Sequence, residues 1–118
     1  MDNWSIENYI DSQGQAPVEE FLNALPLADR VRIVRTIEML GDFGLQLGPP
    51  YVKHLQDKLW ELRIRTGHKA YRVIYFAFTG RRFILLHAFL KKTQKTPRKE
   101  LATAERRLAN FLTSEETS

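Results

Sequence analysis

The stretch LWELRIRTGHKAYRVIYFAFTGRRFILLHAFLK, residues 59–91, decides the fold of this chain. Three runs rich in β-branched and aromatic residues predict three strands, at residues 59–65, 71–78 and 82–89. The connections between them are short, and each contains a glycine. Connections of this kind predict that the three strands pair in an antiparallel meander.

Upstream of the meander, the sequence predicts one strand and two helices. A short strand is expected at residues 4–10, and Pro17 suits the first turn of the first helix. The second helix is expected to run from Leu27 or Ala28 to Leu40. Its predicted core face holds five apolar residues: Leu27, Val31, Val34, Ile37 and Leu40. A segment rich in Gly and Pro, predicted to be irregular, then crosses into the meander.

Downstream of the meander, Pro97 opens a last helix, with Thr96 as its candidate N-cap. Five apolar residues repeat there at helical spacing: Leu101, Ala104, Leu108, Phe111 and Leu112. A frayed polar tail is expected at residues 114–118. The predicted order is therefore β-α-α-β-β-β-α, an α+β fold with one domain over residues 1–113.

Composition limits the class of protein. With 118 residues, 43% of them hydrophobic, the chain suits one compact domain with a modest core. It has no cysteine, which excludes disulfides, thiolate metal sites and a cysteine nucleophile. The N-terminus lacks an apolar signal region, and no run approaches the roughly 20 apolar residues that span a bilayer. We therefore expect a cytoplasmic protein that does not enter a membrane.

Charge is distributed unevenly along the chain. Residues 51–99 carry thirteen Lys and Arg against only Asp57 and Glu61, while acidic residues outnumber basic ones on both sides. The net charge of +4 therefore conceals a strongly basic middle segment. Because these charges punctuate the predicted strands, they should form one folded surface, and a polyanion is its natural partner.

Short motifs in this segment carry a resemblance to a known family. They are Lys53-His54-Leu55, Leu59-Trp60-Glu61-Leu62-Arg63, Tyr71-Arg72-Val73, Leu86-His87-Ala88-Phe89 and Lys91-Lys92-Thr93-Gln94-Lys95-Thr96-Pro97. Their order and spacing resemble the phage Gp49-like, HigB-type branch of the RelE/ParE toxin superfamily, over nearly the whole chain. The resemblance implies a RelE-like fold, with a small and mainly antiparallel sheet packed against helices.

The same resemblance implies a function and partners. The chain would be the toxin of a type II toxin–antitoxin system, restrained by a helix-turn-helix antitoxin of the HigA-like kind. Most such toxins cleave mRNA in a ribosome-dependent manner and thereby inhibit translation. Operator DNA would be bound only through the antitoxin.

The residue types themselves favour metal-independent endoribonuclease chemistry. Cleavage through the RNA's own 2′-hydroxyl needs a base, cations around the phosphate and a proton donor for the departing 5′-oxygen. The basic segment offers Arg, Lys, His and Tyr but only two carboxylates, which argues against a two-metal nuclease. The three histidines lack the close spacing of a metal-ligand set. We expect no metal and no other cofactor.

The first meander strand predicts where its arginines point. Trp60, Leu62 and Ile64 form the better core face, so Arg63 and Arg65 should project from the opposite, open face. Arg63 lies inside the strand and is the candidate phosphate clamp, whereas Arg65 lies at the turn and is a candidate RNA contact. Each could instead be an ordinary solvated charge.

The register of Arg72 is open. A symmetric five-residue turn would put Arg72 on the face of Ile64, toward the core, as a structural arginine. A bulge or a different turn register would instead set it beside Arg63. Because the matching arginine of the resembling family binds the scissile phosphate, we predict a bulge and a catalytic Arg72.

Proton transfer is assigned to Lys91, Lys92 and one of His54 or His87. Neighbouring cations would lower the pKa of a strand-end lysine, although both lysines have an alternative as solvated charges. His54 lies in the predicted crossing and could equally cap a loop. His87 shares its predicted face with three apolar residues and could equally pack there: Phe83, Leu85 and Phe89.

Further side chains are predicted to contact RNA or the ribosome, and they are Lys53, Arg65, Tyr71, Lys95, Arg98 and Lys99. Tyr71 would stack on a base, or else simply pack. Two rival functions stay open. A ParE-like poison of DNA gyrase needs no converging cluster of Arg and Lys, and a non-catalytic nucleic-acid-binding protein would tolerate the loss of any one arginine.

Overall fold

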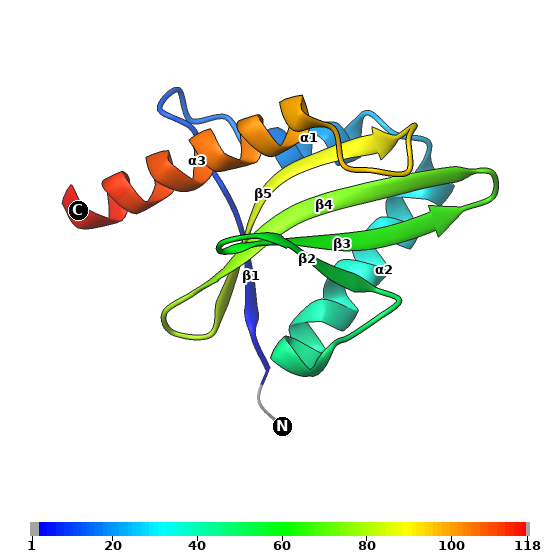
Figure 1. The fold of residues 1–118 in the computed structure, drawn as a ribbon, viewed down its shortest axis with the longest axis horizontal. Helices are drawn as coiled ribbons and strands as arrows, with labels where there is room; N and C mark the ends of the chain where they lie inside the picture. Colours follow the sequence, from blue (N-terminus) through cyan, green and yellow to red (C-terminus); the bar gives the residue numbers. More distant parts are fainter. Residues whose placement is uncertain (1–2, 118) are drawn as a thin grey trace.

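The computed structural model describes residues 3–117 and has three α-helices and a five-stranded mixed sheet (Figure 1). In chain order the elements are β1 (Ser5–Asn8), α1 (Pro17–Asn23), α2 (Leu27–Phe43), a 3₁₀ turn (Gly44–Gln46), β2 (Val52–Gln56), β3 (Leu59–Thr66), β4 (Lys69–Phe78), β5 (Arg82–Lys91) and α3 (Arg98–Thr117). The α+β class is confirmed.

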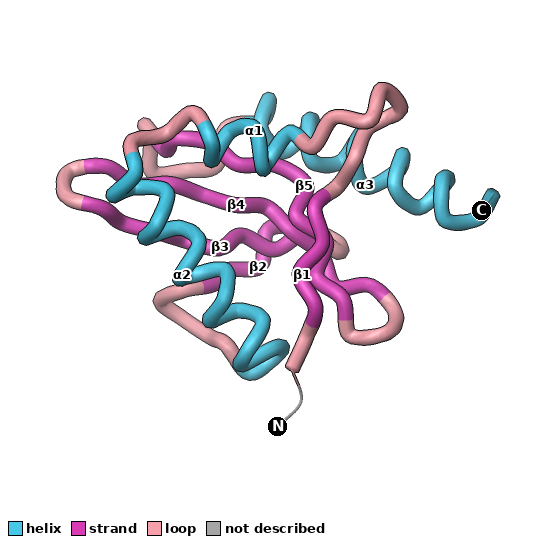
Figure 2. Tube along the Cα trace, turned by 180° about the vertical axis from the view of Figure 1, so that it is seen from behind, coloured by secondary structure: helices cyan, strands magenta, loops and turns pink. Residues whose placement is uncertain are grey.

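The strands lie in the order β1-β5-β4-β3-β2. β3, β4 and β5 form the predicted antiparallel meander, β2 adds an antiparallel edge, and β1 pairs in parallel with β5. Helices α1 and α2 cover one face of the sheet, and α3 crosses the other (Figure 2). No helix of the described part of the chain is long and apolar enough to cross a membrane.

Alternation along the strands sends apolar side chains to both faces. On β3, Leu62 and Ile64 pack toward α1 and α2 as predicted, but Leu59 is buried against α3. Trp60, expected in the core, is more than a third exposed. The face that bears Arg63 is therefore not wholly open, because α3 covers its Leu59 end and leaves only the hairpin end uncovered.

The sequence reading missed β2. Residues 52–56, expected to be irregular, form an edge strand in which Lys53 pairs with Glu61 and His54 pairs with Trp60. Only two residues of this strand are apolar, Val52 and Leu55. An edge strand with so little apolar surface has the composition of a loop, which is why no strand pattern was visible.

The core face of α2 differs from the predicted one. Leu27, Val31 and Val34 are exposed, and the buried face includes Ile33 and Thr36. Thr36 is accommodated there because its hydroxyl donates to the carbonyl of Arg32 at 3.0 Å.

The same helix continues past its predicted end at Leu40. Gly41 lets α2 pass close to β1, since a Cβ at Gly41 would lie 3.1 Å from the carbonyl oxygen of Trp4. At the other end of the chain, α3 runs to Thr117, so residues 114–117, expected to form a polar tail, lie in the last turn of that helix. Ser118 lies outside the described residues.

A bulge in β5 changes which face its second half presents. Ile74 pairs with His87 and the next residue, Tyr75, pairs with Leu85, so Leu86 is an extra residue without a direct partner. Phe83 and Leu85 face α1 and α2, whereas Leu86 and Phe89 face α3. We expected His87 to share a face with Phe83 and Leu85, but the bulge places it on the face of α3.

Candidate functional site

Arg63 on β3 and Arg72 on β4 are direct cross-strand partners. Directly opposed residues of an antiparallel pair share a face, so both side chains project from the uncovered part of the α3 side. The predicted juxtaposition is thus present, but its predicted cause is wrong. Thr66 pairs with Lys69 across a turn of only two residues, and the left-handed backbone of Gly67, at φ +56°, permits that turn.

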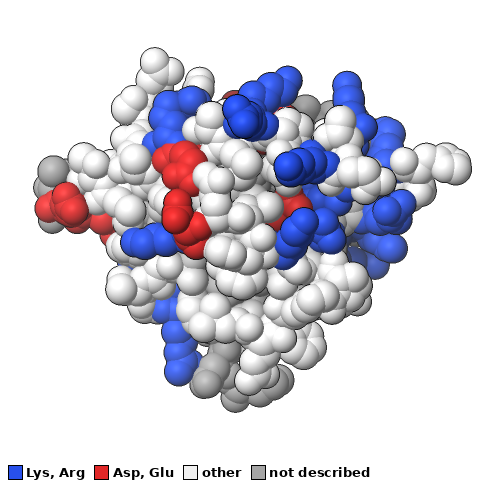
Figure 3. Space-filling model, in the orientation of Figure 1, with Lys and Arg blue, Asp and Glu red and all other residues white. Residues whose placement is uncertain are grey.

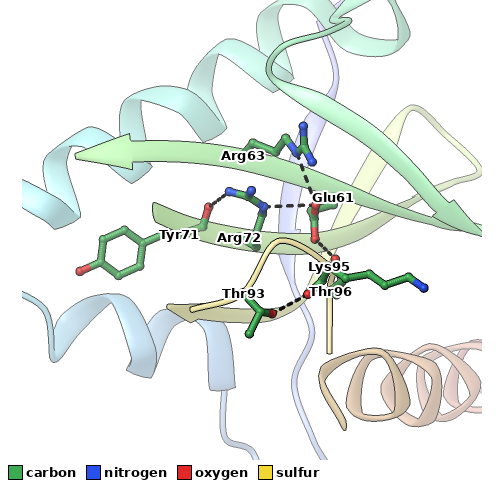
Figure 4. Close-up of polar contacts among 7 residues, drawn as sticks. All are labelled: Glu61, Arg63, Tyr71, Arg72, Thr93, Lys95 and Thr96. Atoms are coloured by element: carbon green, nitrogen blue, oxygen red, sulfur yellow. Dashed lines mark hydrogen bonds and ion pairs between the residues drawn. The ribbon is translucent and has the colours of Figure 1, made fainter. Parts of the chain in front are cut away.

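The carboxylate of Glu61 joins the two arginines (Figure 4). Its Oε1 lies 3.2 Å from Nε of Arg72 and 3.5 Å from Nε of Arg63, and its Oε2 accepts a 2.6 Å hydrogen bond from the hydroxyl of Thr96. Glu61 is 1% exposed and Arg72 is 6% exposed. A buried carboxylate thus fixes both guanidinium groups and ties the loop before α3 to the sheet.

Sequence reasoning missed this role of Glu61. The available signal was a single acid inside an apolar strand, two residues before Arg63 and therefore on the same face. The charge of Glu61 also affects the pKa of Arg72. Burial lowers the pKa of Arg72, the charge of Glu61 opposes this, and Arg63 and Arg65 reinforce the lowering.

Lys91 and Lys53 lie on the same face as the two arginines. Lys91 ends β5 opposite Ala70, two residues beyond the partner of Arg72, and Lys53 pairs with Glu61 from β2. Burial lowers the pKa of Lys91, and the charges of Arg72 and Arg63 lower it further. The structure therefore gathers Lys53, Arg63, Arg72 and Lys91 around Glu61, and we call these four residues the basic cluster.

Other predicted cations surround the basic cluster at the surface. Lys92 and Lys95 are exposed in the loop that follows β5, and Arg98 and Lys99 are exposed in the first turn of α3. Arg65 is exposed two residues beyond Arg63. Figure 3 shows Lys and Arg gathered over the half of this face that carries the β3–β4 hairpin, whereas most visible acidic atoms lie toward α3.

The structure separates both histidine candidates from the arginines. His54 pairs with Trp60, on the face opposite Arg63, and its Nε2 lies 2.7 Å from the carbonyl oxygen of Asp57. Its ring also packs on that of Trp60, with centroids 4.8 Å apart. His54 thus closes the β2–β3 turn, and the structure does not bring this candidate base together with the arginines.

His87 is held by α3 instead of by substrate-facing groups. Its Nε2 donates to Oε1 of Glu100 at 2.7 Å, and its Nδ1 accepts from Nη1 of Arg107 at 3.1 Å. Burial lowers its pKa, and the bond to Glu100 opposes this. Both ring nitrogens are occupied, so the structure corrects the catalytic prediction in favour of a packed, hydrogen-bonded residue.

Tyr71, predicted to contact RNA, is 2% exposed and lies on the α1 and α2 side of the sheet. Its hydroxyl donates to Oδ2 of Asp29 at 2.7 Å, and the hydroxyl of Thr66 donates to Oδ1 at 2.8 Å. The side chain of Tyr71 therefore ties the hairpin to α2, and the structure does not bring this predicted RNA contact together with the arginines. Burial and Asp29 raise the pKa of Tyr71 to about 12.

This tie predicts a pH-dependent effect of Tyr71→Phe. The bonds from Tyr71 and Thr66 lower the pKa of Asp29 below its usual 3.8, so their contribution to stability is present above that pH and is lost as pH falls through the lowered value. We expect Tyr71→Phe to reduce the free energy of unfolding by about 1.5 kcal/mol at pH 7. The reduction should be smaller at pH 2, where a larger share of Asp29 is protonated than at pH 7. Urea unfolding of both proteins at the two pH values measures it, and an equal cost at both would exclude a bond to the charged carboxylate.

A hollow of about 340 Å³ adjoins the basic cluster. It is lined by Arg32, Thr36, Pro50, Tyr51, Arg63, Ile64, Arg65 and Arg72. Arg32, which comes from α2, was missed by sequence reasoning because only the tertiary fold brings it to β3. Among residues 3–117, no group of three or more His, Asp or Glu is placed to hold a metal ion.

Comparison with known proteins identifies the class of protein to which this arrangement belongs. Residues 20–109 match the family model described as phage derived protein Gp49-like, and since this match covers most of the chain, the chain belongs to that family. The Gp49-like family is associated with toxins of toxin–antitoxin systems. No curated protein matches the chain.

Proposed function

We propose that this chain is a HigB-type toxin with a RelE-like topology, and that it is a metal-independent endoribonuclease acting on mRNA bound to the ribosome. The observation that carries the proposal is the convergence of Arg63, Arg72 and Lys91 on one uncovered face, with buried Glu61 fixing the two guanidinium groups. A surface that bound RNA by charge alone would not need such a buried support.

In this mechanism the arginines act on the phosphate. Arg63 and Arg72 hold the scissile phosphate and stabilise the charge that builds on its oxygens as the 2′-oxygen attacks phosphorus. A 2′,3′-cyclic phosphate forms, and the bond to the 5′-oxygen breaks. Planar guanidinium groups suit this task because each can donate two parallel hydrogen bonds to phosphate oxygens.

Lys91 is the proposed proton donor to the departing 5′-oxygen. Its lowered pKa, caused by burial and by the neighbouring arginines, makes proton release easier than from a solvated lysine. Water takes the proton of the 2′-hydroxyl in this scheme, because neither His54 nor His87 faces the arginines. Lys92 remains a proposed second donor from the adjoining loop.

The surrounding cations supply the proposed contacts with partners. Lys53, Lys95, Arg98 and Lys99 would bind the backbone of mRNA or ribosomal RNA. The protein would then act in the cytoplasm. A helix-turn-helix, HigA-like antitoxin would restrain the toxin, and operator DNA would be bound only through that antitoxin. A ParE-like gyrase poison is less well supported, because it gives no reason for the clustering of Arg63, Arg72 and Lys91.

The proposal is tested by inducing the protein in cells and mapping mRNA 5′ ends, with and without translation blocked. New 5′ ends are expected within translated regions, and they should vanish when translation is blocked. The control is Arg63→Ala, which should remain folded, because the side chain is one-third exposed, and yet produce fewer ends. Growth arrest without new 5′ ends would instead support the gyrase alternative.

A further inference from the structure

The hollow beside the basic cluster lies where β3 loses its edge partner. Pairing between β2 and β3 ends at Val52 and Leu62, and the last bond to this edge is donated by the amide of Arg63 to the carbonyl of Tyr51 at 2.7 Å. Beyond that bond, the described strands leave the edge of β3 uncovered. The hollow therefore wraps around the edge, from Arg63 and Arg72 on one face to Arg32 on the other.

The charge of the hollow is unbalanced. Four of its lining side chains are arginines, and none is an acid. Glu61 faces Arg63 and Arg72, but among residues 3–117 the guanidinium groups of Arg32 and Arg65 make no hydrogen bond or ion pair. Nε of Arg63 is buried and has no hydrogen-bond partner, although it lies 3.5 Å from Oε1 of Glu61 in an ion pair. Unpaired guanidinium groups around a concave site are suited to an anion, and their fork of donors fits phosphate.

Two uncharged residues of the lining, Pro50 and Tyr51, are exposed to solvent. Tyr51, the residue before β2, is 41% exposed, and Pro50 lies beside it. Exposed aromatic rings next to arginines are the usual platform for bases of single-stranded nucleic acid. The combination of four arginines with an exposed tyrosine in one hollow fits a nucleotide, not a free inorganic anion.

We infer that this hollow binds one nucleotide of single-stranded RNA adjacent to the scissile phosphate, with its phosphate on Arg32 and Arg65 and its base stacked on Tyr51. The inference rests on the proposed function, since it places the scissile phosphate on Arg63 and Arg72. The RNA strand then turns around the uncovered edge of β3. Duplex RNA is excluded, because its paired bases cannot enter a hollow of about 340 Å³.

Fluorescence anisotropy with a short, labelled RNA that carries 2′-O-methyl groups tests the inference, because this RNA binds but cannot be cleaved through its 2′-oxygen. Arg32→Ala should weaken binding about tenfold and reduce the dependence of log K on log salt by about 0.7. Tyr51→Ala should weaken it about tenfold without changing that dependence. Tyr51→Phe keeps the ring and should restore binding.

The matched control is Arg35→Ala, which removes an exposed charge from the same helix at a position that does not line the hollow. It should change affinity by less than about twofold. Binding by Arg32→Ala and Tyr51→Ala that equals the control, or absence of RNA binding by the wild-type protein, would overturn the inference. Each variant's melting curve is recorded to confirm that it is folded.

The 5′-end mapping separates this inference from the proposed function. If the wild-type protein cuts mRNA but the hollow variants bind RNA like the control, the nucleotide site is wrong and the nuclease stands. If the wild-type protein does not cut mRNA but the variants lose RNA binding as expected, the nuclease is wrong and the hollow remains an RNA site.

Discussion

An Arg72→Lys protein is expected to fold and keep its charge, yet cleave mRNA about 10²–10³ times more slowly than the wild type. The guanidinium of Arg72 makes several contacts at once. Its Nε lies 3.2 Å from Glu61, its Nη1 donates to the carbonyl of Tyr71 at 3.2 Å, and its face toward the hollow is proposed to hold phosphate. A single ammonium group cannot make these contacts together.

Single-turnover cleavage of mRNA on programmed ribosomes, with a melting curve for the same preparation, measures this effect. The control is Arg82→Lys, which changes an arginine paired with Glu7 near the other end of the sheet and should cleave like the wild type. If Arg72→Lys melts lower but the folded fraction cleaves normally, Arg72 is a structural arginine. Unchanged cleavage by a fully folded variant would remove it from the proposed site.

Removal of Glu61 should have the largest effect on stability. We expect Glu61→Ala to lower the free energy of unfolding by about 3–5 kcal/mol, because it leaves the buried charge of Arg72 without a counter-ion. It also removes the acceptor for the hydroxyl of Thr96. Glu61→Gln keeps an acceptor for Thr96 but not the charge, so its cost should be smaller.

Urea unfolding of these variants tests the role of Glu61. Glu105→Ala is the matched control, since that carboxylate accepts a 2.9 Å bond from the exposed Gln56 and faces no buried cation. It should cost less than about 1 kcal/mol. Equal costs for Glu61→Ala and Glu105→Ala would show that the charge of Arg72 does not depend on this carboxylate.

The meander and the helices could be predicted because their signals are local. Alternating apolar residues and short glycine-containing connections define β3, β4 and β5, and prolines mark where α1 and α3 begin. The missed strand β2 has no comparable local signal, because it is stabilised mainly by its pairing with β3. The exposed stripe on α2 was misassigned because apolar spacing alone cannot say which of two adjacent faces meets the sheet.

The candidate site was predictable only in part. The strand pattern and the family resemblance both pointed to Arg63, whereas Arg72 was placed beside it through the resemblance alone, because the strand pattern left its register open. The roles of Glu61 and Arg32 depend on contacts between elements, and the residues next to them in the sequence do not indicate those contacts. His87 was placed on the wrong face because no residue type marks the extra position at Leu86.

The extra residue Leu86 also limits which mutations β5 can accept. It moves every later residue of the strand to the opposite face, so Lys91 reaches the arginines only because Leu86 has no direct partner on β4. A substitution within the strand alters one side chain. Deletion of one codon there would instead turn Lys91 toward the face of α1 and α2, and Leu90 toward the face that bears the arginines. Natural variation should therefore hardly ever change the length of β5.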